Sequence, residues 1–336
     1  MTHSLLIHPT QNPMFNIGDY VQAIAARQFC ASESYGYVDR ELLNKYEGDK
    51  TKVIMNGWFM FTDNWPPSDQ IDPLFVAFHI NSSADEILLS KESIEYLKKH
   101  EPIGCRDYRT RDILLKKGVD AYFSACLTLT LGLTYRNSGN GTEYYIVDPV
   151  VEPSFKLRDI CSYIWTFISK PQKVLKIYRK VQNKQIMTLS KVIVFLSQYR
   201  KLISEDILLQ AHYPSVYVKN SFENEDQKFV YADECLNRYA NAKLVITSRI
   251  HCQMPCIAMN TPVLFLKNEN DALDSTCRFG GLSDLYNTIN YKKGSFSSTD
   301  IDLSSPIKYG TEIRNKTNHM GYVKDLVDRC KEFVMK

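Results

Sequence analysis

The sequence has little glycine and little proline, and its charges of opposite sign are nearly balanced. Only 14 of its 336 residues are glycine and 13 are proline, which argues against a collagen-like or low-complexity chain. Lysine and arginine number 41 against 38 acidic residues, so the formal net charge is +3. This balance is far from that of a dedicated nucleic-acid-binding protein. No nucleic-acid partner is therefore expected.

The sequence also lacks long hydrophobic runs. No stretch approaches the roughly 20 apolar residues of a membrane-spanning helix. The opening residues MTHSLLIHPTQNPMF lack the charged leader and apolar stretch of a secretory signal. The nine cysteines are an odd number and are widely spread, which fits reduced thiols. We therefore expect a cytoplasmic protein.

What the chain does have is enough apolar side chain, at 44% of residues, for a sizeable core. Its length is more than twice the ~150 residues of one typical domain, so two domains are expected. Short apolar runs alternate with helical patterns in two regions, which predicts parallel sheets covered by helices in an α/β fold with two Rossmann-like domains. In the first region the predicted strands are 4–8, 52–55, 74–78, 101–105, 120–123 and 144–148.

Helices complete both regions of the pattern. In the first region three helices are expected. The first is DYVQAIAARQF, with Asp19 as its N-cap, and the others cover 90–99 and 107–117, the last with Asp107 as its N-cap. In the second region, residues 205–290, the expected order is a helix over 223–242, a strand over 244–247, a short helix over 251–260 and a strand over 262–266.

The segment between the two regions, residues 156–201, has a different composition. It contains eleven lysines and arginines against one acidic residue, Asp159, interleaved with aromatic and aliphatic side chains. A basic amphipathic helix of this kind can lie in an anionic membrane interface, where each nearby cation contributes roughly 1 kcal/mol. The alternative is a solvated helical insertion that packs its apolar side on a neighbouring domain. The one-sided charge slightly favours the membrane surface.

The strongest candidate site lies in LVITSRIHCQMPCIAMNTPVLFL, residues 244–266, where a buried strand breaks at Thr247-Ser248-Arg249 before a short helix. Loops at the carboxyl ends of parallel strands are where ligands bind, and a helix N-terminus favours an anion. The guanidinium of Arg249 can pair with a carboxylate or phosphate, and His251 can give or take a proton near neutral pH. The alternative is an inter-domain salt bridge of Arg249 beside a half-buried histidine.

Other residues occupy comparable positions in the first region. Arg106 follows a strand just as Arg249 does, so the two arginines could converge across a cleft. In the loop NPMFNIGDY, Asn16 precedes Gly18, which would allow close backbone approach to a ligand. Asp19 could orient a sugar hydroxyl or simply cap the helix. His79 also ends a strand, where a lone histidine is more often a core residue.

Several familiar chemistries have no motif in the sequence. There is no G-x-G-x-x-G fingerprint for a nicotinamide or flavin cofactor, and no P-loop, G-x-S-x-G elbow or H-E-x-x-H motif. Cys252 and Cys256 share one helical face, which we interpret as core packing rather than a metal site. No cofactor and no metal are expected.

Five stretches together carry a family resemblance. They are NIGDYVQAIAARQF, MNGWFM, WPPSDQIDPLFVAFHI, EPIGCRDYRTRDILLKKGVDAYFSACLTLTL and AKLVITSRIHCQMPCIAMNTPVLF. With these stretches the chain resembles the polysaccharide pyruvyl transferase family over most of 12–135 and 230–290. Residues 156–201 have no recognisable counterpart in that family, and Ala125 stands where a glycine is expected in the run Ser-Gly-Cys-Leu-Thr.

The resemblance implies a glycosyltransferase-B-like arrangement of two domains with a cleft between them. It also implies transfer of the pyruvyl group of the donor phosphoenolpyruvate to a sugar of a bacterial surface glycan, such as an exopolysaccharide or capsular polysaccharide, as a ketal. Arg106 and Arg249 would bind the donor's carboxylate and phosphate, and His251 would be the general acid. The remaining residues expected to bind substrate are Asn16, Gly18, Asp19, Trp58, His79, Thr247 and Ser248.

The expected division of the chain follows from this assignment. Residues 1–150 would be the acceptor-side domain, 151–204 the basic insertion, 205–317 the donor-side domain and 318–336 a C-terminal helix. A lipid-linked acceptor would explain a cationic segment on an enzyme at the inner face of the cytoplasmic membrane. The competing hypotheses are a glycosyltransferase that uses a nucleotide sugar and a non-catalytic glycan-binding protein, because fold does not fix function.

Overall fold

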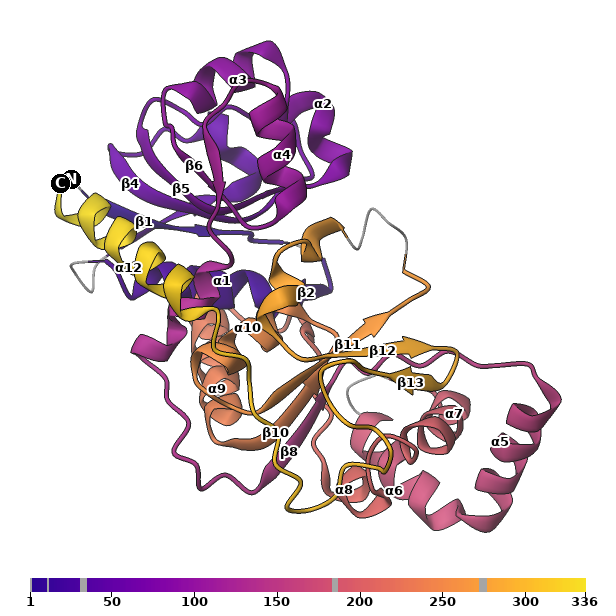
Figure 1. The fold of residues 1–336 in the computed structure, drawn as a ribbon. Coiled ribbons are helices and arrows are strands. Elements are labelled where there is room, and N and C mark those ends of the chain that lie inside the picture. The colour runs from indigo at the N-terminus through magenta and orange to yellow at the C-terminus, as the bar shows by residue number, and fades with distance from the viewer. Residues whose placement is uncertain (1, 11, 31–34, 183–186, 272–276) are drawn as a thin grey trace.

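A computed structural model of the chain describes residues 2–10, 12–30, 35–182, 187–271 and 277–336. It is a mixed α/β protein with two largely parallel sheets flanked by helices, consistent with Rossmann-like folds. Figure 1 shows the first sheet in the upper part of the view and the second sheet in the lower part. The α/β architecture predicted from the alternating pattern is confirmed.

The first sheet has six strands in the order β3-β1-β4-β5-β6-β7, all paired in parallel. The two long central strands are largely buried, as continuous apolar runs in a parallel sheet should be. Every predicted strand of this sheet is present. The bounds are β1 Thr2–Ile7, β3 Gly36–Asp39, β4 Thr51–Phe59, β5 Ile71–Ile80, β6 Ile103–Cys105 and β7 Ala121–Phe123.

The helix starts in this half follow from their caps. Asp107 caps the predicted 107–117 helix by accepting from the Thr110 backbone N–H. The prediction for the first helix is wrong by three residues: Asn16, not Asp19, accepts the capping hydrogen bond, from the Gly18 N–H, so Asp19 lies in the first turn. The helices of this half are α1 Ile17–Arg27, η1 Arg40–Lys45, η2 Ser82–Ala84, α2 Asp85–Leu88, α3 Lys91–Lys98, α4 Tyr108–Lys116 and η3 Leu127–Leu133.

The second sheet has five strands in the order β13-β12-β11-β10-β8, with β13 antiparallel to β12. The strand predicted at 144–148, which we counted with the first domain, lies in this sheet because β8 pairs in parallel with β10. The bounds are β8 Glu143–Val147, β10 Ala242–Thr247, β11 Val263–Asn268, β12 Thr288–Lys292 and β13 Ser295–Ser297. Between the strands of this sheet, and apart from the helices of the basic insertion, lie α8 Glu205–Gln210, α9 Glu225–Ala240, α10 Ile250–Ala258, η4 Cys277–Phe279 and η5 Leu282–Leu285.

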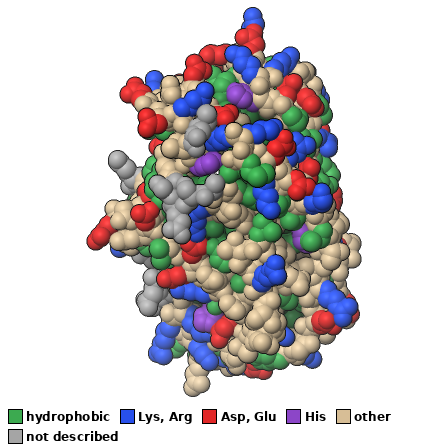
Figure 2. All heavy atoms as spheres, turned by 90° about the vertical axis from the view of Figure 1, so that its left-hand side faces the viewer, with side chains coloured by type: hydrophobic (Ala, Val, Ile, Leu, Met, Phe, Trp, Pro, Cys, Tyr) green, Lys and Arg blue, Asp and Glu red, His purple; other side chains and the backbone are tan. Residues whose placement is uncertain are grey.

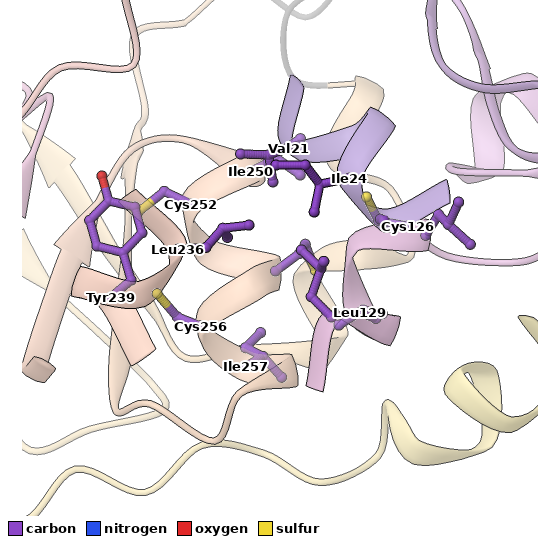
Figure 3. Packing of buried hydrophobic residues seen from close by; sticks show 14 of the residues in the cluster. Val21, Ile24, Cys126, Leu129, Leu236, Tyr239, Ile250, Cys252, Cys256 and Ile257 are labelled. Carbon is purple, nitrogen blue, oxygen red and sulfur yellow. The ribbon is translucent and has the colours of Figure 1, made fainter. Parts of the chain in front are cut away.

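One continuous core joins the two halves. Figure 3 shows Val21 of α1 beside Ile250 of α10, with Cys252 and Cys256 on the side of α10 that faces Tyr239 of α9. Both cysteines are buried in this core, as the packing interpretation expected. A small antiparallel pair, β2 Met14–Asn16 with β9 Tyr217–Lys219, also links the halves. The segment between β1 and α1 is thereby held against the segment between α8 and α9.

The C-terminal helix α12, Met320–Met335, returns to the first half. The Lys52 ammonium donates to the Phe333 carbonyl at 2.7 Å, and the Arg329 guanidinium lies 4.4 Å from the ring centroid of Tyr122. Figure 2 shows the side of the molecule on which Figure 1 draws this helix, where acidic and basic side chains are interspersed and hydrophobic ones occur in small groups.

The basic insertion forms α5 Leu157–Ser169, α6 Pro171–Gln182 and α7 Leu189–Tyr199. Helices α6 and α7 bury Val174, Ile177 and Phe195 in the core under the second sheet, as the insertion hypothesis predicted. Lys184, one of the eleven cations, lies outside the described residues. No helix within the described ranges has both the length and the apolar character needed to cross a membrane.

Candidate active site

A cavity of about 380 Å³ is lined by side chains from both halves of the molecule. The first half contributes the segment around β2 and the start of α1, together with side chains at the ends of β3, β4 and β6. The second half contributes the loop after β10 and residues of β9 and η4. The predicted site residues that line the cavity are Asn16, Gly18, Asp19, Trp58, Arg106, Ser248, Arg249 and His251.

Arg106 and Arg249, predicted from equivalent loops, both lie in this lining. Arg106 is 2% exposed. Its guanidinium lies 3.4 Å from the Gln22 amide oxygen, and its buried Nε has no hydrogen-bond partner among the described residues. Arg249 donates through Nε to Asp148 at 3.0 Å. The two guanidinium groups thus meet at one cavity, one nearly unpaired and the other fixed by a carboxylate.

The alternative for Arg249, an inter-domain salt bridge, does not match the structure. Asp148 directly follows β8, and β8 and β10 are neighbours in the second sheet, so the ion pair joins two strand ends of the same half. The Arg249 guanidinium also lies 5.2 Å from the ring centroid of Tyr217. This geometry holds the side chain at the rim of the cavity.

Two further arginines in the lining were missed from the sequence. Arg40 forms ion pairs with Asp19 at 3.2 Å and Glu41 at 3.0 Å. Arg278 has a buried Nε with no partner within the described ranges. Burial lowers the pKa of Arg106 and of Arg278 below the usual arginine range, because neither guanidinium is fully matched by negative charge.

A signal existed for one of these arginines. Arg40 follows a strand end, as Arg106 and Arg249 do, but the strand β3, GYVD, has one buried side chain, so no apolar run marks it in the sequence. Arg278 lies in a single short turn, η4, where no strand-end or motif spacing singles it out. Only the tertiary structure brings it to the cavity.

His251 occupies the first turn of α10 and faces the start of α1. A Cβ on Gly18 would lie 2.8 Å from its Nδ1, so glycine at 18 permits this close approach between the two helices. The Nε2 atom of His251 is buried and has no partner among the residues the structure describes. Burial, followed by the positive charges of Arg106, Arg278 and Arg40, holds the pKa of His251 well below its ordinary value. The imidazole is therefore neutral at pH 7 in the free protein.

His79 and Thr247, also predicted as site residues, do not line the cavity. His79 is buried behind it, with Nδ1 at 2.5 Å from the Asp107 carboxylate. Burial, helped by the charge of Arg106, lowers the pKa of His79 to about 4. Burial alone would raise the pKa of Asp107, but the His79 hydrogen bond and the charges of His79 and Arg106 lower it. Asp107 is thus an ionised carboxylate behind Arg106.

Thr247 and Ser248 shape the turn that presents Arg249. The Thr247 hydroxyl accepts from the Arg249 backbone N–H at 3.1 Å, and the Ser248 hydroxyl donates to the Asp148 carbonyl at 2.7 Å. These bonds fix the backbone between β10 and α10. Thr247 therefore supports the site from behind, whereas Ser248 also reaches its lining.

The opposite part of the lining is aromatic. Trp58 and Phe61 lie with ring centroids 4.3 Å apart, and the Arg40 guanidinium lies 5.5 Å from the ring centroid of Trp58. Trp58 follows Gly57, whose φ of +134° accompanies a shift in the register of β4 against β5. The cavity thus combines a cationic wall, an imidazole and an aromatic wall.

The chain was also compared with known proteins. A family model described as polysaccharide pyruvyl transferase matches residues 16–270. This range contains the loops of Asn16, Arg40, Trp58, Arg106 and Arg249. Neither the curated proteins nor the solved structures contain a match to the chain.

Proposed function

The chain belongs to the polysaccharide pyruvyl transferase family, and we propose on this premise that it transfers the pyruvyl group of phosphoenolpyruvate to a sugar. The product is a ketal that bridges two hydroxyls of a bacterial surface-glycan precursor. One observation carries the proposal: three buried nitrogen atoms without partners among the described residues, Nε of Arg106 and Arg278 and Nε2 of His251, belong to side chains that line one cavity.

The charge of the cavity suits a small dianion. Of the four arginines in the lining, Arg40 is paired with Asp19 and Arg249 with Asp148. Arg106 and Arg278 have no ion pair within the described residues. A buried charge without a partner is costly by several kcal/mol, so a ligand with two negative groups would be bound strongly. Phosphoenolpyruvate carries a carboxylate and a phosphate, which match guanidinium groups through charge-assisted hydrogen bonds.

The reaction requires a proton at the right carbon. One sugar hydroxyl oxygen forms a bond to C2 of the donor while the C3 methylene takes a proton and becomes a methyl group. The second hydroxyl oxygen then bonds to C2 as the C–O bond to phosphate breaks. Two hydroxyl protons are released in total; one balances the proton added to C3 and the other leaves with phosphate. His251 is the group we assign to proton transfer, and the arginines stabilise the departing phosphate.

The lowered pKa of His251 in the free protein is compatible with this role because the negative charge of the bound donor would raise it. Positive charges of Arg106, Arg278 and Arg40 add to burial in disfavouring the imidazolium. A bound dianion offsets those charges and raises the pKa of His251 toward its ordinary range. The imidazole then takes up a proton more readily when the donor is in place. Protonation of the histidine is thereby coupled to donor binding.

The acceptor sugar fits the aromatic wall. Carbohydrate faces stack on aromatic rings, and Trp58 with Phe61 provides such a surface close to the carboxylate of Asp19, which also lines the cavity. Asp19 would orient a sugar hydroxyl toward the donor carbon. We include a lipid-linked glycan in the proposal as the form in which the acceptor is presented.

The test is direct. The purified protein is incubated with phosphoenolpyruvate and a galactoside acceptor, and release of inorganic phosphate is measured together with pyruvylated product by mass spectrometry. Arg249→Ala should lose nearly all product while its unfolding transition stays cooperative. Lys91→Ala, a substitution at an exposed cation that does not line the cavity, is the control. Product formed from nucleotide sugars but not from phosphoenolpyruvate would overturn the proposal.

A further inference from the structure

Helix α5 packs on the protein through its polar side. The Ser162 hydroxyl contacts the Ser197 hydroxyl of α7 at 2.8 Å. The Tyr163 hydroxyl accepts from the Gln198 amide at 3.1 Å, and the Asp159 carboxylate accepts from the Ser154 hydroxyl at 2.6 Å. The only fully buried residue of the helix is Thr166. The contact between α5 and the rest of the molecule is therefore made largely by hydrogen bonds.

The apolar side of α5 faces solvent. Leu157, Ile160, Ile164 and Ile168 are spaced at i, i+3, i+7 and i+11, which places them on one stripe of the helix. All four are exposed, Leu157 by 78% and Ile168 by 72%. Exposed aromatic side chains lie beside the stripe and just before the helix, namely Trp165, Phe167 and Phe155. An ordinary surface helix has the reverse orientation, with its apolar stripe against the core.

The next helix does not share this reversal. The next helix, α6, buries Val174 and Ile177 in the core while Lys176 and Arg179 point outward as exposed residues. The two helices are adjacent in sequence and similarly basic, but only α6 has the usual orientation. The exposed stripe is therefore not a general property of residues 156–201. Figure 1 shows α5 at the outer edge of the molecule, beyond α7 as seen from the second sheet.

The charges around the stripe are positive. Lys156 and Arg158 are exposed and precede and follow Leu157, so they flank the stripe at its start. Neither has an ion-pair partner in the part of the chain that the structure describes. The one acidic residue of the helix, Asp159, is held by Ser154. Trp165 lies between two cations, 5.4 Å from the Lys170 ammonium and 5.2 Å from the Arg200 guanidinium.

We propose that α5 is an interfacial anchor that lies in the surface of a bilayer containing anionic lipids. Its exposed stripe enters the boundary between headgroups and acyl chains, and Lys156 and Arg158 contact lipid phosphates. Tryptophan beside the stripe is the residue type typical of this boundary. Anionic lipid matches the flanking charges, whereas a second copy docked through the same face would bring the two sets of cations together. The inference is independent of the donor chemistry.

The experiment measures binding of the whole protein to sedimented vesicles, without donor or acceptor. Vesicles of phosphatidylcholine alone are compared with vesicles that also contain phosphatidylglycerol. Wild type should sediment with the anionic vesicles, and less so as salt is raised. The double variant Ile164→Ser, Ile168→Ser should lose about tenfold or more in partitioning. Its control, Leu115→Ser with Val230→Ser, replaces two exposed apolar residues elsewhere and should bind as wild type.

A charge-reversal arm separates lipid charge from hydrophobic adhesion. Lys156→Glu with Arg158→Glu should lose binding to anionic vesicles, whereas Lys91→Glu with Lys117→Glu, an equal charge change at exposed sites, should retain most of it. Equal sedimentation of wild type and the double serine variant would overturn the proposal. So would a wild-type dimer in solution that the serine variant converts to monomer, since the occupant of the stripe would then be a second copy.

Discussion

The cavity and helix α5 depart from the usual arrangement of a globular protein in opposite directions. In the cavity wall, Arg106 is buried with hardly a partner. On α5, Leu157 and Ile168 are exposed. Each arrangement costs free energy in the isolated protein, and each cost is offset when a matching partner arrives: an anion in the cavity, an apolar interface at the helix. Departures of this kind mark the places where a fold is built for something other than its own stability.

The comparison assigns different consequences to mutations in the two regions. Changes in the cavity should alter chemistry and donor binding and should leave vesicle binding unchanged. Changes on α5 should do the opposite.

The largest effect is expected at His251. His251→Gln keeps an uncharged polar side chain in the cavity but removes the proton donor, so the turnover rate should fall by about 10²–10⁴-fold. Phosphate release under saturating phosphoenolpyruvate measures it. The Ile164→Ser, Ile168→Ser variant of α5, assayed with a soluble acceptor, is the control and should keep its rate. A loss of only about twofold in His251→Gln would remove the histidine from the mechanism.

The same residue predicts a pH dependence of donor binding. The pKa of His251 is lowered in the free protein and rises when a dianion binds, so donor binding takes up a proton at pH values between the free and bound pKa. Affinity for phosphoenolpyruvate should therefore fall as pH rises through the bound pKa. Titration calorimetry in two buffers of different ionisation enthalpy measures the uptake, which should be missing in His251→Gln.

The next largest effect is on the free energy of unfolding, where substitutions in α5 and α6 should differ. Ile177 of α6 is fully buried, whereas Ile164 of α5 is exposed by 54%. Ile177→Ala should lower the free energy of unfolding by about 2–5 kcal/mol, and Ile164→Ala should change it by less than about 0.5 kcal/mol. Urea denaturation of the two variants measures the difference. Similar losses would mean that the α5 stripe is covered in the folded protein.

Substitution of Arg106 tests whether its buried positive charge destabilises the folded protein. Arg106→Met removes a buried guanidinium but keeps most of the apolar contact, and Asp107 retains its hydrogen bond to His79. The free energy of unfolding should rise by about 1–2 kcal/mol, less than when a whole buried ion pair is replaced, because Asp107 loses the favourable charge of Arg106. Phosphoenolpyruvate binding should be lost. Arg111→Met, on the surface of α4 beside Asp112, is the control and should do neither. A destabilised Arg106→Met protein would mean that the charge is satisfied in the native state.

The sequence pattern predicted the buried strands and helices well because their periodicity is local. It failed where the pattern is interrupted. The strand predicted at 52–55 continues to Phe59, past polar Asn56 and Gly57 with its positive φ. That irregular end carries Trp58 to the cavity.

For the site, strand-end arginines could be predicted, and Arg106 and Arg249 do meet at one cavity. Arg278 could not be predicted, because a single short turn has no pattern. The orientation of α5 was equally inaccessible: an amphipathic sequence defines two faces but not which of them meets the protein. Only the hydrogen bonds of Ser162 and Tyr163 to α7 settle that question.

The smallest effect is expected in the loop between β7 and η3. Ala125, where the family resemblance led us to expect glycine, has a φ of +61° and is fully buried. A left-handed alanine costs roughly 1–2 kcal/mol. Glycine would relieve this, but it would forfeit a buried methyl of about 0.8 kcal/mol and add roughly 0.5–1 kcal/mol of chain entropy to the unfolded state. Ala125→Gly should therefore change the free energy of unfolding by less than about 1 kcal/mol.

Ala23 of α1 provides the matched comparison for that substitution. It is equally buried but lies within a helix, so Ala23→Gly loses the methyl and the helix propensity without relieving any strain, at about 1.5–2 kcal/mol. Urea denaturation measures the free energy of unfolding of both variants. The difference between their losses gives the cost of the left-handed backbone conformation at Ala125. Equal losses would show that the loop before Cys126 relaxes freely.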